Sequence, residues 1–189
     1  MAAGRGTHGG FTLIEVLMVV TLIALVASFA IPKIDFTRYR VNAATRGLTG
    51  LLNRAQRLAV TDQSNVNVVF DLTNATVTLH EDANNDNVRD AGERVRSYPL
   101  GEGAAFGLGG APTRSYTPGP ITFTRRYSSS PELIFRRDGS ASESGAIYVT
   151  SIRATRDAKP ADTRSVETVA STGRVEWYLY DGSNWNRRF

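Results

Sequence analysis

The feature that most constrains this chain is an apolar run over residues 11–31, in which Glu15 is the only charged residue. As a helix with a rise of about 1.5 Å per residue, this run would span roughly 30 Å, the thickness of a bilayer core. A charge at the centre of a bilayer costs on the order of 2.5–3.5 kcal/mol on insertion scales. The run therefore predicts a transmembrane helix over residues 11–31 in which something must tolerate or use Glu15.

Two simple interpretations each leave part of the run unexplained. A secretory signal cleaved after Ala30 would need a short uncharged core, and Glu15 interrupts that core. A plain transmembrane anchor accounts for the length but not for the carboxylate. The flanking basic residues do not fix an orientation by the positive-inside rule, because more of them follow the run than precede it.

The heptapeptide GFTLIEV, residues 10–16, resembles the class III signal of type IV prepilins and pseudopilins. The resemblance implies that a prepilin peptidase cuts after Gly10 and that the new N-terminal residue, Phe11, is methylated. Glu15 and Pro32 stand where that family has a glutamate and a proline after the cut. The chain would then divide into four segments: a leader peptide (1–10), a transmembrane helix (11–31), a stem helix (32–62) and a β-rich head (63–189).

Two explanations for Glu15 stay open, and both can hold at different stages. The free amine of Phe11 in a neighbouring subunit could pair with the carboxylate, which would remove two unpaired charges from lipid and set a staggered register between subunits. Alternatively, Glu15 lies near a helix N-terminus, where the helix dipole favours an anion and the side chain can reach the headgroups.

Beyond Pro32, where a kink is expected, apolar residues recur at helical spacing to about Thr61. The predicted apolar stripe of this amphipathic helix consists of Val41, Ala44, Leu48, Leu51, Leu52, Ala55, Leu58 and Ala59. The arginines between them form its solvated face.

From Asn65 onward the hydrophobic period changes to two, which predicts strands. The expected strands cover residues 65–71, 75–81, 94–100, 132–139, 145–151, 165–170 and 173–182. Residues 101–120 and 154–163 are rich in turn-forming residues and are expected to be surface loops. These elements predict an α+β fold in which a long N-terminal helix, transmembrane in its first half, packs on antiparallel β-sheet as in pilins.

This order of elements resembles the GspH/FimT group, the minor pseudopilins of type II secretion and minor pilins of type IV pili. The resemblance covers nearly the whole chain and is carried downstream by LNRAQRLAVTDQSNVNVVF, DANNDNVRDAGE, FRRDGSAS and STGRVEWY. It implies a structural subunit that is held in the inner membrane with its head outside the cytoplasm. Its partners would be other pilins or pseudopilins, the prepilin peptidase and the inner-membrane assembly platform. A major, filament-forming pilin is the alternative.

One loop has the spacing of calcium ligands. Residues 82–93 place oxygen-bearing side chains at positions 1, 3, 5, 9 and 12 of a twelve-residue loop, and a backbone carbonyl at position 7. The candidate ligands are Asp82, Asn84, Asp86, Val88, Asp90 and Glu93. Asn87 stands where such loops need glycine, and it tolerates a left-handed backbone best after glycine. The alternative is a polar hairpin loop without a metal.

Arginines and aromatic residues suggest a DNA site, as in FimT-like minor pilins that bind DNA for natural transformation. Members of that branch resemble one another in a Gly-Arg-x-Arg element; here Gly173 and Arg174 match, and Glu176 replaces the second arginine. The candidate DNA contacts are Arg125, Arg126, Arg174, Trp185, Arg187 and Arg188. The alternative is that Trp177 and Leu179 belong to the core and the arginines are simply exposed.

Enzymatic function is not expected. The chain has no cysteine, and its two histidines are His8, in the segment expected to be removed, and His80, on a predicted strand with no evident nucleophile partner. A net charge of +4 indicates solubility rather than a dedicated polyanion partner. No cofactor is predicted apart from the candidate calcium ion.

Overall fold

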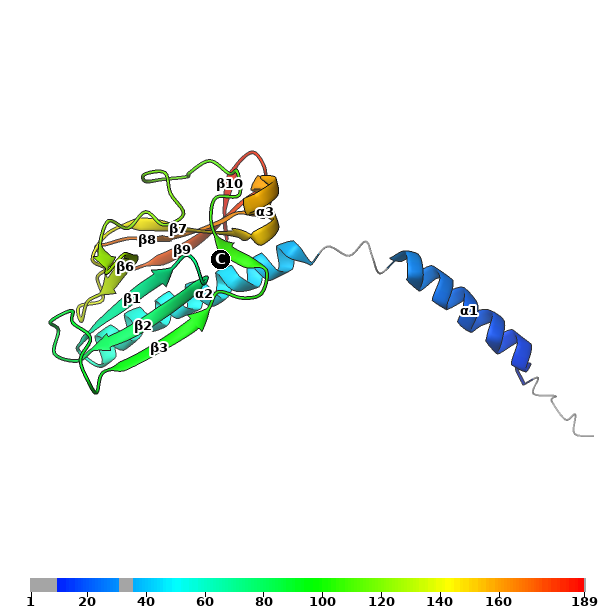
Figure 1. The fold of residues 1–189 in the computed structure, drawn as a ribbon, viewed down its shortest axis with the longest axis horizontal. Helices are drawn as coiled ribbons and strands as arrows, with labels where there is room; N and C mark the ends of the chain where they lie inside the picture. The colour runs from blue at the N-terminus through cyan, green and yellow to red at the C-terminus, as the bar shows by residue number, and fades with distance from the viewer. Residues whose placement is uncertain (1–9, 31–35, 189) are drawn as a thin grey trace, which may run out of the picture. The chain divides into compact units, whose positions relative to one another are not determined.

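The computed structural model describes residues 10–30 and 36–188 (Figure 1). The chain divides into two units, Met1–Phe36 and Thr37–Phe189. Within the described residues, the first unit contains helix α1 (Leu13–Ala30). The second unit contains helix α2 (Thr37–Thr61) and every described strand.

Helix α2 buries the apolar stripe that the sequence predicts. All eight predicted residues are buried or partly buried, and Val41, Leu52 and Ala55 are fully inaccessible. The arginines of α2 stand on its exposed side, as an amphipathic helix requires. The helix ends at Thr61, where the sequence predicts its end, but its predicted beginning and the predicted kink at Pro32 lie outside the described residues.

The strands form two antiparallel sheets. The first has the order β3-β2-β1-β6-β5 and the second the order β10-β9-β8-β7-β4. The first sheet consists of β1 (Asn65–Asp71), β2 (Thr76–Asp82), β3 (Arg94–Pro99), β5 (Arg126–Tyr127) and β6 (Ser130–Phe135). The second consists of β4 (Ala104–Phe106), β7 (Gly145–Ser151), β8 (Arg164–Thr168), β9 (Val175–Tyr180) and β10 (Trp185–Arg188). The short helices α3 (Ile152–Asp157) and η2 (Pro160–Asp162) connect β7 to β8.

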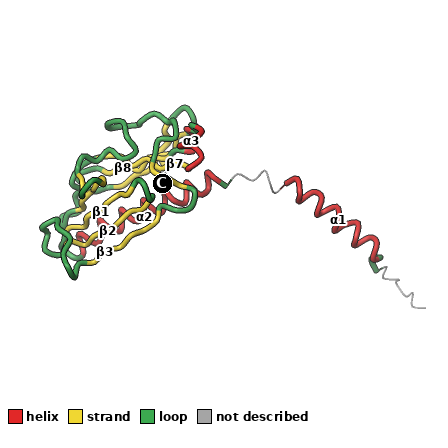
Figure 2. The backbone as a smooth tube through the Cα atoms, in the orientation of Figure 1, coloured by secondary structure: helices red, strands yellow, loops and turns green. Residues whose placement is uncertain are grey.

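Helix α2 contacts strands of both sheets, so one core serves the whole head (Figure 2). Aromatic rings join the sheets inside this core. The ring of Phe70 on β1 lies 6.1 Å from Phe106 on β4 and 5.8 Å from Phe123, measured between centroids. The predicted α+β fold, a helix packed on antiparallel sheet, is therefore confirmed.

Most strand predictions are correct to within two or three residues at their ends, but both predicted loops need correction. Residues 101–120 contain β4, which pairs with β7, and Phe106 is only 7% exposed. The three residues of β4 are too few to display a period of two, and its burial depends on a distant partner strand. Residues 154–163 contain most of α3 and all of η2, and the sequence likewise does not predict the short strands β5 and β10.

A buried arginine fastens the N-terminal half of α2 to the second sheet. Arg164 on β8 is 1% exposed, and its Nε donates to Asn42 Oδ1 on α2 at 2.7 Å. Its Nη1 donates to the carbonyl oxygens of Ala161 and Thr163 at 3.0 and 2.9 Å. Burial lowers the pKa of Arg164 to about 10, so the guanidinium remains charged at neutral pH with all these acceptors around it.

A glutamine attaches the C-terminal half of α2 to two turns of the head. Gln56 Nε2 donates to the carbonyl oxygens of Gly139 and Thr172 at 2.9 and 2.8 Å, which joins α2 to two turns between strands. Gly173 sits against this junction with φ of +61°. A Cβ at Gly173 would overlap the Gly139 carbonyl oxygen and lie 2.6 Å from Gln56 Nε2. The glycine of the Gly-Arg pair is thus required by packing.

We predict that Gly173→Ala destabilises the head by about 2–4 kcal/mol, from steric overlap and a left-handed backbone together. Gly182→Ala is the matched control, because Gly182 also has a positive φ but no atom within 4 Å of an added Cβ. It should cost about 1 kcal/mol. Urea unfolding of both variants measures the difference, and equal losses would contradict the packing role of Gly173.

Candidate functional site

The first turn of α1 contains a reciprocal cap built from Thr12 and Glu15. The backbone N–H of Glu15 donates to Thr12 Oγ1 at 3.3 Å, and the backbone N–H of Thr12 donates to Glu15 Oε2 at 3.4 Å. This Thr-x-x-Glu arrangement is a capping box, and the dipole of the helix favours the carboxylate there. Glu15 therefore has partners within its own chain. Thr12 is a residue that the sequence analysis missed, although the spacing was visible.

The described side chains of residues 11–28 form an exposed, mainly apolar surface. From Phe11 to Val26, every large apolar side chain is at least 52% exposed. These side chains occur on all sides of α1, and in water such a surface is unfavourable. Among the residues that the structure describes, no helix qualifies as a membrane span by length and hydropathy.

The predicted processing residues lie just ahead of α1. Gly10 and Phe11 are exposed and precede the first helical residue, Leu13, so the bond between them is not part of a helix. Cleavage after Gly10 and methylation of Phe11 stay predictions. The candidate assembly residue Pro32 lies outside the described residues.

The loop of residues 82–93 uses its acidic side chains to bind its own backbone. Asp82 is fully buried and accepts from the backbone N–H groups of Asp86 and Asn87 at 3.2 and 2.8 Å. Asn87 has φ of +61°, the left-handed conformation that the sequence predicts for this position. Asn84 Nδ2 donates to Asp86 and Asp90 at 2.9 and 3.0 Å. The loop is therefore ordered by hydrogen bonds that need no ion.

The same contacts involve the candidate calcium ligands. Val88, whose carbonyl oxygen is the predicted ligand, donates its N–H to Asp86 Oδ1 at 2.7 Å, so that carboxylate also serves the backbone. Across residues 10–30 and 36–188, no three His, Asp or Glu side chains are arranged to hold a metal ion. The arrangement lends the calcium site no support, and calcium binding stays a prediction.

Glu93 closes the loop against the sheet. Its Oε1 accepts from the N–H of Ala83 at 2.9 Å, and its Oε2 accepts from the N–H of Asp90 at 3.0 Å. Its Oε2 also lies 2.5 Å from Nε2 of His80, whose side chain is 1% exposed. The N–H of Asp90, then His80 and Ala83, lower the pKa of Glu93 to about 2. His80 is thus part of a loop anchor.

We predict a pH dependence from Glu93. Its folded pKa of about 2 is below the ordinary 4.5, so the ionised form stabilises the fold fully above pH 4.5. This contribution disappears as pH falls through about 2. Glu93→Gln should therefore lower Tm at pH 7, and its difference from wild type should shrink between pH 4.5 and 2.

Thermal melts at several pH values measure this difference. Glu102→Gln is the control, because Glu102 is 85% exposed and lies 3.7 Å from Arg40, a surface ion pair that contributes less than about 1 kcal/mol. A Glu93→Gln deficit that stays constant down to pH 2 would contradict the assignment.

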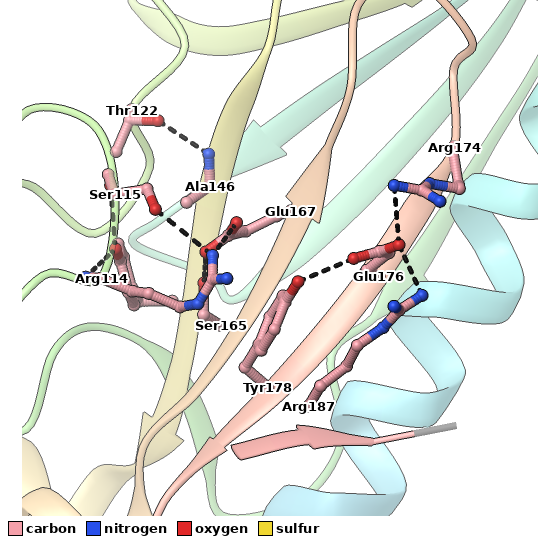
Figure 3. A network of polar contacts seen from close by, with 11 residues as sticks. Arg114, Ser115, Thr122, Ala146, Ser165, Glu167, Arg174, Glu176, Tyr178 and Arg187 are labelled. Carbon is pink, nitrogen blue, oxygen red and sulfur yellow. Dashed lines mark hydrogen bonds and ion pairs between the residues drawn. The ribbon is translucent and has the colours of Figure 1, made fainter. Parts of the chain in front are cut away.

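The second sheet carries an ion cluster around Glu176 (Figure 3). Arg174 and Arg187 place their Nη2 atoms 3.0 and 2.6 Å from Glu176 Oε1. Tyr178 Oη donates to Glu176 Oε2 at 2.7 Å. That hydrogen bond, and then the two arginines, lower the pKa of Glu176. Two guanidinium groups share one carboxylate, so these three side chains together carry more positive than negative charge.

The structure brings together only some of the candidate DNA residues. By strand alternation, Trp185 and Arg187 of β10 lie on the same face as Glu176 and Tyr178 of β9. The ring of Trp185 packs 5.1 Å from that of Tyr180. Arg188 falls on the opposite face of β10.

The other two candidate DNA residues, Arg125 and Arg126, are at the edge of the first sheet and form contacts within the chain there. Arg125 Nε pairs with Glu132 Oε2 at 2.8 Å, and Glu132 is nearly inaccessible. Arg126 donates to the carbonyl oxygens of Phe123 and Arg125. Both guanidinium groups thus stabilise the turn into β6, and the predicted DNA residues do not form one surface.

Sequence analysis also missed Arg114, which Figure 3 shows beside Glu167. Its Nη1 lies 2.5 Å from Glu167 Oε2, and its guanidinium carbon lies 3.6 Å from the centroid of the Tyr178 ring. Its backbone N–H donates to Tyr148 Oη at 3.0 Å. These contacts hold the segment before β5 across the second sheet. Arg114 stands among Gly, Pro, Ser and Thr, so no periodicity marks it.

Comparison with known proteins gives one motif and two structures. The family model described as the prokaryotic N-terminal methylation motif matches residues 5–31. No curated protein matches the chain. The chain is similar to two structures of the minor pseudopilin EpsH from the type II secretion system of Vibrio cholerae. One has 11% identity and a TM-score of 0.48, covering 74% of this chain and 97% of that chain. The other has 15% identity and a TM-score of 0.47, covering 79% and 99%.

Identities and TM-scores this low do not carry an argument about function. The motif match does confirm the prepilin-like N-terminus around Gly10, Phe11 and Glu15. The motif and the α+β fold described above both agree with the predicted resemblance to type IV pilin-like proteins.

Proposed function

We propose that this chain, which carries the prokaryotic N-terminal methylation motif over residues 5–31, is a minor pseudopilin or minor pilin of the GspH/FimT group. It would be a structural subunit of a type II secretion pseudopilus, supporting protein export across the outer membrane, or of a type IV pilus. The motif match is the observation that carries the proposal. The exposed apolar surface of α1 supports it, because a subunit that moves from lipid into a helical bundle needs such a surface.

The proposed pathway of the chain, from membrane insertion to assembly, has three steps. Residues 11–31 first anchor it in the inner membrane, with the head outside the cytoplasm. A prepilin peptidase then cuts after Gly10 and methylates Phe11, whose exposure ahead of α1 suits both reactions. Finally, the assembly platform transfers the subunit into a filament of other pilins or pseudopilins. Each step relies on contact with another protein, so no catalytic group in this chain is needed.

Glu15 would change partners during assembly. In the single chain, its carboxylate is held by the N–H of Thr12 at 3.4 Å, a long and weak hydrogen bond. The amine of Phe11 in a neighbouring subunit would be a stronger partner, because two opposite charges in apolar surroundings stabilise each other once neither faces lipid alone. The cap therefore keeps the carboxylate at the helix start, available for exchange.

We predict that Glu15→Ala is still processed but enters filaments about tenfold less, a difference of about 1.4 kcal/mol in assembly free energy. The reason is that the neighbouring amine would lose its carboxylate partner. Immunoblots of membrane and sheared filament fractions measure incorporation, and the mass of the membrane-bound protein reports processing.

Two further variants complete the experiment. Thr12→Val removes the side-chain cap but keeps the carboxylate, so its incorporation should stay near wild type. Gly10→Val should remain unprocessed in the membrane. Wild-type incorporation of Glu15→Ala would refute the assembly role of the carboxylate, and normal processing of Gly10→Val would refute the cleavage site.

A second proposal, DNA capture for natural transformation, is supported by the net positive charge around Glu176. Arg174 and Arg187 are 62% and 46% exposed, so phosphates could reach both. The carboxylate of Glu176 opposes this, because it neutralises one guanidinium and repels phosphate.

We predict that Glu176→Gln strengthens DNA binding several-fold, because it frees one positive charge, and that Arg174→Ala together with Arg187→Ala weakens it. Gel shifts of the full-length chain in detergent at low salt provide the measurement. Arg96→Ala is the control, since Arg96 is exposed on β3 at the edge of the first sheet, whereas the cluster lies on the second sheet. No shift with wild type or with Glu176→Gln would end the proposal.

A further inference from the structure

An apolar groove of about 420 Å³ runs along the N-terminal half of α2. One wall is α2, with Leu48 and Leu51, and the other is the end of β3 and the residues after it, with Tyr98 and Leu100. The groove is separate from the Glu176 cluster and from the loop of residues 82–93. Leu48 and Leu100 are buried at its base, whereas Leu51 and Tyr98 are partly exposed and would be more stable against an apolar partner.

Helix α2 carries a glycine at the margin of the groove. Gly47 lines it, and a Cβ at this position would meet no atom within 4 Å. Glycine inside a helix costs about 1 kcal/mol relative to alanine, and nothing in the packing of the head requires it here. Gly50 has the same freedom on the same helix but does not line the groove.

Beside the groove lies an open sheet edge. Strand β3 is terminal in the first sheet and pairs only with β2 among the described strands, so one side of its backbone has no strand partner (Figure 1). Arg96 and Tyr98 pair with Leu79 and Val77, which belong to the core, so both lie on the α2 side of the sheet. A strand added to this edge would thus direct alternate side chains toward the groove.

The groove itself is lined by Arg40 and Glu102, but the helix and the strand that flank it are basic. Helix α2 carries five arginines and no acidic residue. Within the described residues, Arg46 and Arg96 have no hydrogen-bond or ion-pair partner, and Arg40 pairs only with the exposed Glu102 at 3.7 Å. A partner for this surface should therefore bring carboxylates to the rim and an apolar side chain to the centre.

We propose that the groove and the edge of β3 bind an extended acidic segment of a partner protein as an added strand. An acidic side chain would pair with Arg96, and an apolar side chain two positions along would enter the groove beside Tyr98 and Leu51. Strand addition supplies backbone hydrogen bonds for affinity, and the groove supplies selectivity. This interaction concerns the head alone and does not depend on the assembly role of Glu15.

The test uses a labelled peptide, acetyl-Thr-Glu-Thr-Leu-Thr-Glu-Thr-amide, and the full-length chain in phospholipid nanodiscs. Fluorescence anisotropy should show saturable binding below about 1 mM. Gly47→Leu should weaken binding about tenfold or more, because its side chain fills the groove. Gly50→Leu should bind like wild type. Both variants should melt at or above the wild-type temperature, since leucine is a better helix former than glycine.

Two altered peptides complete the test. A peptide with Lys in place of Glu should bind at least about tenfold more weakly, and so should one with alternate backbone amides methylated. No saturable binding, equal effects of Gly47→Leu and Gly50→Leu, or unchanged binding of the methylated peptide would each overturn the proposal. Self-association of the chain that Gly47→Leu abolishes would assign the groove to a second copy and overturn it as well.

Discussion

The apolar stripe of α2 is the contact on which the head depends. Each sheet directs apolar side chains toward α2, and without the helix these side chains would be in water. One helix covers both, because Val41, Leu52 and their neighbours lie in a core that includes strands from each sheet. Arg164 and Gln56 then fix the two halves of that helix by hydrogen bonds to turns and strand ends. Both sheets are therefore held in place by the same helix.

Several acidic side chains of the head form hydrogen bonds and ion pairs within the chain. Asp82 and Glu93 accept backbone N–H groups around their loop, and Glu167 and Glu176 hold arginines against the second sheet. A carboxylate binds an N–H group or a guanidinium through the same oxygens that could ligate a metal ion. The same negative charge repels a phosphate. Residue types and spacing that predict a calcium loop or a DNA surface are therefore also compatible with a self-contained structure.

Some candidate functional residues of this chain lie in one local motif, and others come together only in the folded head. The predicted processing and assembly residues, Gly10, Phe11 and Glu15, stand in one short linear segment that the N-terminal methylation motif covers, so the sequence could suggest them before any fold was known. The groove beside β3 joins residues some fifty positions apart, such as Gly47 and Tyr98, and no local pattern connects them. Arg114 is similar, because its partners lie on β7, β8 and β9.

The sequence alone determined the prepilin-like N-terminus, the apolar stripe of α2 and the longer strands, because each depends on neighbours within a few positions of the chain. It also determined the left-handed backbone at Asn87. Only the tertiary structure decided that β4 belongs to a sheet, that Gly173 has no room for a side chain, and that Glu176 pairs with two arginines. These features arise where distant segments meet, and their energies come from packing and charge pairing that periodicity does not encode.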